Sequence, residues 1–210
     1  MKSHFDFDPA VAIAHLRDSD ENLRDLIDRV GPFTMELKRV DSLFKAMSQS
    51  IIYQQIHGNA AAAIHGRVIK VLNQQGGVTP EALIKASDTN LRTAGLSANK
   101  LMALRDLALK CEEGIVPTLK EARKLSDAEL IERLTQVRGI GTWTVHMLLI
   151  FTLGRSDVLP TGDFSIRLGF KKLYRKRKDP KPDAIIKHAR KWQPYRSVAS
   201  WYLYRLHDLE

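Results

Sequence analysis

Helix start and stop signals recur along this chain, and they constrain its fold more than any other feature. Asp8 and Thr79 each stand before a proline, which is the order of an N-cap and the first helical residue. Ser126 and Glu129 have the spacing of a capping box, and Gly31-Pro32 is a stop signal. Apolar residues between these signals recur at helical spacing, and strand-like alternation is nearly absent. The pattern predicts an all-α chain of roughly ten short helices.

The expected helices are placed by their caps and apolar faces. They begin near Pro9, Glu21, Ser42, Gly58, Thr79, Ser97, Ser126 and the glycine turn at 139–141, and the last three cover about Phe164–Leu173, Pro182–Arg190 and Pro194–Leu209. No internal repeat or low-complexity linker interrupts the series. The length of 210 residues therefore indicates one domain or two intimate lobes.

The positive charge of the chain is concentrated in one segment. The formal net charge is +9, from 33 Lys and Arg against 24 Asp and Glu. Residues 167–196 hold twelve basic and two acidic side chains, so the remainder is close to neutral. A local basic excess favours a nucleic-acid partner, because phosphate contacts dominate the affinity of proteins for DNA and RNA. The alternative is a solvated segment that only maintains solubility.

Cysteine content and hydropathy exclude several classes of protein. The single cysteine, Cys111, excludes an internal disulfide framework and a four-cysteine cluster. No apolar run approaches the ~18 residues of a membrane span, and the N-terminus lacks the apolar core of a secretory signal. We therefore expect no membrane partner and a cytoplasmic location. His57, His65 and His146 lack metal-ligand spacing, so we expect neither a cofactor nor a catalytic metal.

A glycine turn followed by a lone carboxylate is the feature most informative about function. Gly139-Ile140-Gly141 follows the apolar positions Leu134 and Val137 and precedes a helix. Glycine tolerates positive φ and lets a phosphate approach the backbone, and the N–H groups at a helix start favour anions. Asp163 lies 22 residues after Gly141, at the start of the next helix. A phosphate clamp leading to a carboxylate suggests chemistry performed on a nucleic acid.

Four motifs follow one another along the chain in a recognisable set. They are the hairpin L-x-x-V-x-G-I-G-x-W-T over 134–144; Pro160-Thr161-Gly162-Asp163 with Phe164, Ile166 and Arg167; the run 50–56 with Ala61, Ala62, Ile64 and Arg67; and Gly95-Leu96-Ser97 with Lys100, Leu104 and Leu107. The hairpin alone is moderately specific, but the set together resembles the helix-hairpin-helix (HhH-GPD) DNA glycosylase superfamily. Within it the chain resembles the monofunctional alkyladenine branch, of the 3-methyladenine DNA glycosylase II type.

The resemblance covers essentially the whole chain and implies a two-lobed helix-hairpin-helix glycosylase fold. Lobe 1 is expected over about 1–40 and 150–210, and lobe 2 over about 41–149 with the hairpin 134–144, with a cleft between them. The β-domain of larger relatives has no room here. The catalytic loop reads T-G-D where many relatives carry two consecutive acids, which leaves one carboxylate candidate.

The implied activity is that of a base excision repair hydrolase, which flips an alkylated purine out of double-stranded DNA and cleaves its N-glycosidic bond. Positive charge develops on the sugar during cleavage, and a nearby carboxylate opposes it in a partly desolvated pocket. Asp163 is the catalytic candidate, both for this role and for orienting or deprotonating the attacking water. Its alternative role is an N-cap before Phe164 and Ser165, and one residue can fill both roles.

Position 143 predicts the subclass, and it contributes with two tyrosines to the expected base pocket. Glycosylases that also cut the strand carry a Schiff-base lysine where this hairpin has Trp143, and an indole cannot form an imine. We therefore expect hydrolysis alone, leaving an abasic site. Trp143 and Tyr204 match family positions that border and stack on the base, where electron-rich rings attract cationic alkylated purines. Tyr53 is a further pocket candidate, and Trp201 and Tyr202 are alternatives to Tyr204. Core packing is the alternative for each ring.

The resemblance also assigns contacts with DNA. The candidate DNA-binding residues are Gln55, His57, Gly139, Gly141, Thr142, Thr144 and Arg167. Hairpin amides and hydroxyls should hold phosphates 3′ of the lesion, and carbonyls of Thr135, Val137 and Ile140 are the expected ligands of a structural monovalent cation. Gln55 falls at the position of the wedge that fills the vacated stack, and its alternative is a helix end exposed to water. His57 falls where a minor-groove contact is expected.

The expected partner is double-stranded DNA containing alkylated bases, with 3-methyladenine as the expected lesion and 7-methylguanine as a further candidate. We expect a monomer of a bacterial or archaeal type, associated with the nucleoid through DNA. Two other functions stay open. One is a glycosylase for another damaged base, although the lysine and the iron–sulfur cluster of the oxidised-purine and mismatch branches are missing. The other is a non-catalytic DNA-binding protein that keeps the hairpin.

Overall fold

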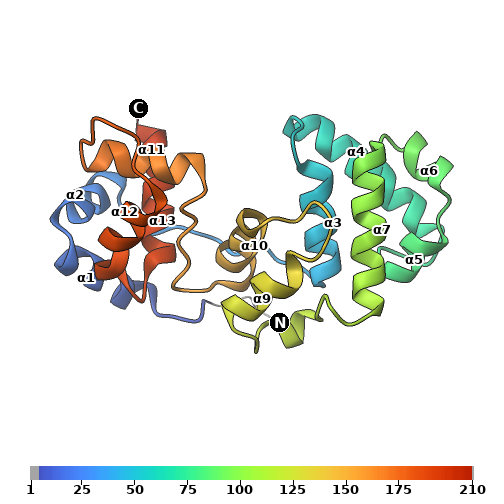
Figure 1. The fold of residues 1–210 in the computed structure, drawn as a ribbon, viewed down its shortest axis with the longest axis horizontal. Helices are drawn as coiled ribbons and strands as arrows, with labels where there is room; N and C mark the ends of the chain where they lie inside the picture. The colour runs from blue at the N-terminus through green and yellow to red at the C-terminus, as the bar shows by residue number, and fades with distance from the viewer. Residues whose placement is uncertain (1–4, 210) are drawn as a thin grey trace. The chain divides into compact units, whose positions relative to one another are not determined.

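The computed structural model describes residues 5–209 and divides into two compact units. The first unit comprises Met1–Arg39 and His146–Glu210, and the second comprises Val40–Val145. The described residues form thirteen α-helices with short 3-10 and π-helical turns and no strand, which confirms the all-α prediction (Figure 1). None of the helices described is long and apolar enough to cross a membrane.

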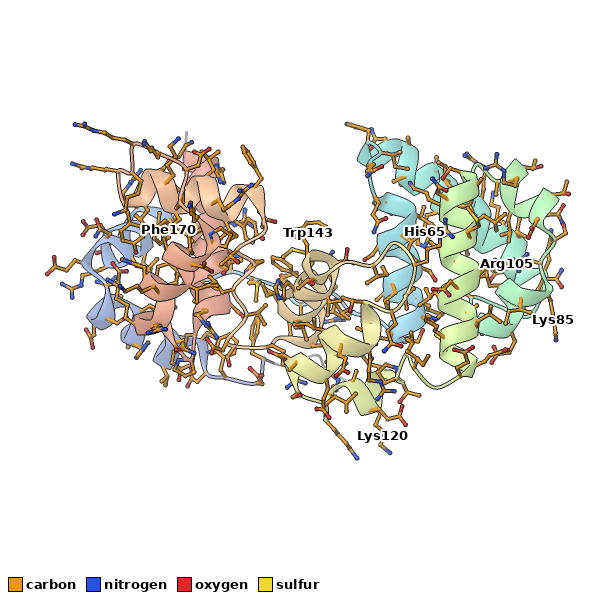
Figure 2. The ribbon with its side chains drawn as sticks, in the orientation of Figure 1. His65, Lys85, Arg105, Lys120, Trp143 and Phe170 are labelled. Atoms are coloured by element: carbon orange, nitrogen blue, oxygen red, sulfur yellow. The ribbon has the colours of Figure 1, made fainter. Side chains whose placement is uncertain are left out.

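The second unit is organised around the helix over residues 98–112. Its helices are α3 (Leu43–Tyr53), α4 (Gly58–Asn73), α5 (Pro80–Lys85), α6 (Asp88–Thr93), α7 (Ala98–Glu112), α8 (Leu119–Ala122), α9 (Asp127–Leu134) and the start of α10 (Thr142–Leu148). Leu104 and Leu107 of α7 are buried, and α7 packs against α3 and α5. The Arg105 guanidinium, also on α7, donates to the carbonyl oxygens of Leu83 and Ala86 and so anchors α5 to α7 (Figure 2).

The first unit gathers both ends of the chain. It contains α1 (Pro9–Ser19), α2 (Glu21–Val30), α11 (Phe164–Leu173), α12 (Pro182–His188) and α13 (Arg196–Arg205), with 3-10 turns at Ala189–Trp192 and Leu206–Leu209 and a π-helical turn at Leu149–Leu153. In Figure 1 the blue helices α1 and α2 lie among the orange and red helices from the other end of the chain. Trp192 and Tyr202 are fully buried in the core of this unit.

A buried carboxylate holds the first unit together. Asp20 caps α2 by accepting from the Leu23 amide, and its side chain is fully buried. Its Oδ2 also accepts from four side chains: Tyr174 Oη at 2.5 Å, Trp192 Nε1 at 2.8 Å, and His188 Nε2 and Lys191 Nζ at 3.1 Å. Burial alone would raise the pKa of Asp20, but these hydrogen bonds outweigh it and hold the pKa far below its usual value. The ionised carboxylate therefore ties α2 to α11 and α12.

Cap chemistry predicted the helix starts better than the helix count. The capping box of Ser126 and Glu129 is formed in both directions, and α2 and α11 have the predicted bounds. The estimate of about ten helices was low, because α6 and α8 are only six and four residues long and show no apolar period. The two C-terminal helices are shorter than predicted and end in 3-10 turns.

Candidate active site and nucleic-acid interface

Asp163 is a buried carboxylate at the N-terminus of α11. The side chain is 8% exposed, and its Oδ1 accepts from the amides of Ser165 at 2.7 Å and Ile166 at 3.1 Å. The Asp163 amide donates to the Pro160 carbonyl, which closes the T-G-D turn ahead of the helix. Asp163 is thus an N-cap, as the alternative interpretation held. The cap leaves the catalytic role open and fixes where the carboxylate lies.

Tyr204 of α13 contacts the same carboxylate. Its hydroxyl donates to Asp163 Oδ2 at 3.1 Å and lies 3.8 Å from the Met147 sulfur. Burial raises the pKa of Tyr204 well above its usual value, and the charge of Asp163 and the hydrogen bond to it add to the rise. Its neighbours Trp201 and Tyr202 are buried in the core of the unit instead. Of the three C-terminal aromatic candidates, Tyr204 is the one that reaches Asp163.

The hairpin between α9 and α10 presents unpaired backbone donors. Gly139 has φ 77°, a left-handed conformation that favours glycine. The turn is held by the Ile140 amide, which donates to the Val137 carbonyl at 3.0 Å. Gly139, Gly141 and Thr142 are exposed, and their amides donate to no atom of the described chain. Such amides at a helix start suit an anionic ligand.

Two of the three carbonyls expected to hold a monovalent cation are unsatisfied in the same turn. The carbonyls of Thr135 and Ile140 accept no hydrogen bond within residues 5–209, whereas that of Val137 accepts the one from Ile140. Carbonyl oxygens are suitable ligands for a hard monovalent cation, so the residues present fit that ligand. Over the same described range, no group of three His, Cys, Asp or Glu side chains could hold a metal ion.

Trp143 projects from the first turn of α10 (Figure 2). Half of its surface is exposed, at 50%, which does not fit core packing beneath the hairpin. Tyr53, at the last position of α3, is partly buried and packs edge-to-face on the His65 ring with the centroids 5.9 Å apart. A second large apolar side chain, Phe164, is 70% exposed directly after Asp163. Sequence reasoning did not single out Phe164 for contact with a base, and only its place beside Asp163 could have done so.

The end of α3 joins the hairpin through a residue that sequence reasoning did not assign. Gln54 Nε2 donates to the Gly139 carbonyl at 2.9 Å. The next residue, Gln55, is exposed and has φ 57°, an uncommon conformation for a residue other than glycine. Gln55 directly follows the C-cap of α3, and helices commonly end with a left-handed residue at this position. His57 is the N-cap of α4, and its Nδ1 accepts from the Asn59 amide at 3.4 Å.

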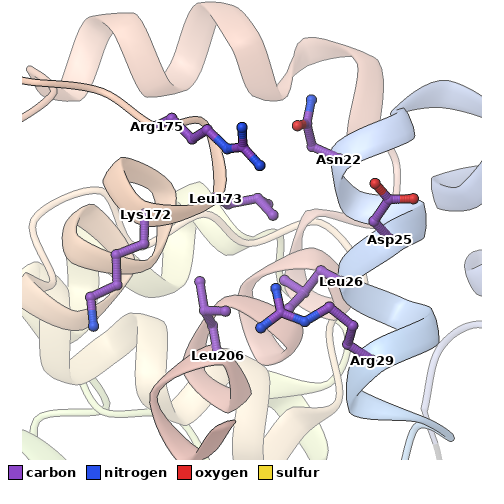
Figure 3. A pocket seen from close by; sticks show the side chains of 8 residues that line it. All are labelled: Asn22, Asp25, Leu26, Arg29, Lys172, Leu173, Arg175 and Leu206. Atoms are coloured by element: carbon purple, nitrogen blue, oxygen red, sulfur yellow. The ribbon is translucent and has the colours of Figure 1, made fainter. Parts of the chain in front are cut away.

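Basic side chains lie along α11 and just after its C-terminal end. Arg167, a DNA-contact candidate, is partly buried, and its Nε atom has no hydrogen-bond partner among the described residues. Further along, Lys172 and Arg175 line a pocket of about 200 Å³ together with Arg29 of α2 (Figure 3). Arg29 and Arg175 are exposed, and no carboxylate of the described chain pairs with either. None of the candidate site residues lines this pocket.

Cys111 is unsuited to nucleophilic catalysis. Burial raises the pKa of the thiol to about 11, and the charge of Glu81 adds to the rise. A thiol with that pKa is almost entirely protonated at neutral pH, and the thiolate is the reactive form.

Comparison with known proteins gives one consistent result. The model of the HhH-GPD superfamily of base excision DNA repair proteins matches residues 48–194. The chain is 40% identical over 199 residues to DNA-3-methyladenine glycosylase 1 of Schizosaccharomyces pombe, covering 93% of this chain and 86% of the relative. Its structure is similar to that of an S. pombe 3-methyladenine DNA glycosylase in complex with abasic DNA, with a TM-score of 0.78, 39% identity and coverage of 94% and 96%. A DNA-3-methyladenine glycosidase from Bacillus halodurans has a TM-score of 0.84 and 33% identity, with coverage of 98% and 92%.

Proposed function

We propose that this chain, which belongs to the HhH-GPD superfamily of base excision DNA repair proteins, hydrolyses the N-glycosidic bond of alkylated purines in double-stranded DNA. The observation that carries the proposal is the placement of Asp163, a buried carboxylate fixed at a helix start by two amides and a tyrosine hydroxyl. Two relatives at 30% identity or more, from Schizosaccharomyces pombe and Saccharomyces cerevisiae, are DNA-3-methyladenine glycosylases by name. We assign the same reaction class to this chain.

Asp163 acts on the sugar as the bond to the base breaks. Cleavage leaves electron deficiency at the anomeric carbon, and a carboxylate within a few ångströms lowers the energy of that transition state. The effect is large because the group is nearly excluded from water, where charge interactions are weakly screened. Water completes the reaction by adding to the anomeric carbon while its proton passes to solvent or to the carboxylate. The products are a free base and an abasic site.

Trp143 supports both the subclass and the lesion. An indole has no amine to attack the sugar, so the hairpin cannot supply a Schiff-base intermediate. Its half-exposed ring is available to stack on a base. Purines methylated at N3 or N7 carry positive charge, which the face of an indole attracts. This chemistry favours 3-methyladenine and 7-methylguanine over neutral lesions, with Tyr53 as a further lining residue.

DNA is held by backbone amides and by cations. The unpaired amides of Gly139, Gly141 and Thr142 are suited to a phosphate, with Thr144 and a cation at the carbonyls of Thr135 and Ile140 as further contacts. Gln55 is the proposed wedge for the vacated stack, His57 a proposed minor-groove contact and Arg167 a proposed phosphate contact. We assign phosphate contacts also to the basic residues of 171–181, because those at 175–178 and 181 are exposed and a run of exposed cations attracts a polyanion. All these groups come from one chain, which suits action as a monomer.

The test is the identity of the products. Duplex DNA treated with a methylating agent is incubated with the protein, and the released bases are separated by chromatography. We expect free 3-methyladenine and 7-methylguanine, with strand breaks formed only after alkali. Intact DNA with no released base would leave the chain a DNA-binding protein without glycosylase activity. A covalent adduct trapped by borohydride would overturn the argument from Trp143, and release of oxidised or deaminated bases alone would indicate another lesion class.

A further inference from the structure

Asp163 is held at both of its oxygens, and the two sets of donors belong to different helices. Oδ1 accepts from two amides of α11, at 2.7 and 3.1 Å, whereas Oδ2 accepts from Tyr204 on α13 at 3.1 Å. The terminal torsion of an aspartate side chain is broad, and each donor that holds one of the carboxylate oxygens narrows it. The hydroxyl of Tyr204 is a donor to the second oxygen from a second helix, and it thereby helps to fix the plane of the carboxylate and the position of Oδ2.

We propose that Tyr204 is a positioning residue, whose hydroxyl orients the Asp163 carboxylate for catalysis, and that stacking of its ring on the base is not its main role. The inference deepens the proposed glycosylase function and rests on it. A carboxylate held in its productive orientation needs no rearrangement as charge develops on the sugar, and such preorganisation is the main source of electrostatic catalysis.

The surroundings of Tyr204 support a fixed donor. The ring is partly buried beside Phe151, with the centroids 6.2 Å apart, and the Met147 sulfur lies within reach of the hydroxyl. Burial and the neighbouring charge of Asp163 raise the pKa of Tyr204, so the phenol is protonated at neutral pH and can donate a hydrogen bond to the carboxylate. Close packing of α11 on α13 keeps donor and acceptor together: a Cβ at Gly169 would lie 2.8 Å from the Leu203 carbonyl oxygen.

The two candidate roles of Tyr204 differ in whether they need its hydroxyl. Tyr204→Phe keeps the ring and removes the donor, so stacking predicts nearly unchanged catalysis and positioning predicts a slower chemical step. We expect the single-turnover rate of base release from methylated DNA to fall about 10- to 100-fold, the range for loss of a hydrogen bond to a charged group. The dissociation constant of Tyr204→Phe for abasic-site DNA should stay within about twofold of the parent value, because the lost hydrogen bond orients Asp163 and does not bind the DNA.

Tyr202→Phe is the matched control. Tyr202 lies two positions away on α13 and is fully buried, and its hydroxyl donates to the Gly31 carbonyl at 3.1 Å, away from Asp163. Tyr202→Phe should keep the single-turnover rate of the parent protein, while its loss of stability should be similar to that of Tyr204→Phe. A purely structural role for Tyr204 predicts the same behaviour for both variants. Rates are compared well below the melting temperature of each protein, so that loss of fold is not read as loss of catalysis.

Two results would overturn the inference. One is a Tyr204→Phe rate within about twofold of the parent, and the other is a loss confined to the dissociation constant, which indicates stacking. Neither result would contradict the proposed function, because each is measured relative to a parent protein that releases the base. A parent protein that releases no base from methylated DNA removes the function itself. The two failures are therefore distinguishable in the same experiment.

Discussion

Two helical glycines should respond in opposite directions to the same substitution. Gly66 lies within α4, and a Cβ built there meets nothing within 4 Å. Gly169 lies within α11, where a Cβ would sit 2.8 Å from the Leu203 carbonyl oxygen and 3.3 Å from the Leu203 Cβ. Backbone of α13 cannot rotate aside as a side chain can. Gly169→Ala therefore forces α11 away from α13, whereas Gly66→Ala disturbs no neighbour.

The magnitudes follow from two opposing terms. Alanine in place of glycine inside a helix stabilises the folded state by about 1 kcal/mol. Overpacking a close helix contact costs about 1–3 kcal/mol, and a backbone clash falls at the upper end of that range. Gly66→Ala should therefore gain about 1 kcal/mol, and Gly169→Ala should lose about 1–2 kcal/mol net. For a chain of this size each kcal/mol moves the melting temperature by about 2–4 °C.

Thermal melting of the two variants beside the parent protein measures these shifts. We expect Gly66→Ala to melt a few degrees above the parent and Gly169→Ala several degrees below it. Gly169→Ala should also slow base release, since α11 carries Asp163 at its start and α13 carries Tyr204. Equal shifts of the same sign in both variants would show that α11 and α13 do not pack closely at Gly169.

Two further predictions concern charge. Asp20→Asn should lower the free energy of unfolding by about 2–4 kcal/mol, because it leaves buried donors without their ionised acceptor. The pKa of Asp20 is lower in the folded than in the unfolded state, so its contribution to stability is complete above the unfolded pKa of about 4 and is lost as the pH falls below that value. The difference in melting temperature between the parent protein and Asp20→Asn should therefore narrow between pH 7 and pH 3. A difference that stays constant over this range would contradict the prediction. Neutralising Lys176, Arg177 and Lys178 should reduce the slope of log affinity against log salt by about 1 for each phosphate that the variant no longer neutralises. The same three-charge change at Lys85, Lys120 and Lys124 of the second unit serves as control, and equal slopes for the two triple variants would argue against DNA binding by the basic segment.

Local chemistry made the helices predictable from sequence. A cap needs only residues three or four apart, as in Ser126 with Glu129, so the sequence displays it directly. The helix α6 is also capped, by Ser87, but six residues leave no room for an apolar period. The hairpin was predictable for the same reason: Gly139, which adopts positive φ, lies only three residues before the start of α10.

Contacts between distant residues could not be predicted in this way. The carboxylate of Asp20 meets side chains more than 150 residues away, and Gln54 meets a carbonyl 85 residues away. Either pairing depends on how the helices pack, which no short-range pattern encodes. Asp163 became the catalytic candidate from its place after the hairpin, whereas its hydrogen bond to Tyr204, 41 residues further along the chain, became visible only in the folded chain. Resemblance had suggested a stacking ring there, and the structure adds a hydroxyl donor.

The central claim is that the negative charge of Asp163 is needed for base release, and Asp163→Asn tests it with little change in the fold. Asparagine caps helices about as well as aspartate, so α11 should keep its start. Asp8→Asn is the matched control, because Asp8 caps α1 by the same kind of bond, to the Ala10 amide at 2.8 Å. The decisive measurement is the single-turnover rate of 3-methyladenine release by the three proteins. We predict a fall of about 10²- to 10³-fold for Asp163→Asn and no change for Asp8→Asn; release by Asp163→Asn at the parent rate would contradict the account.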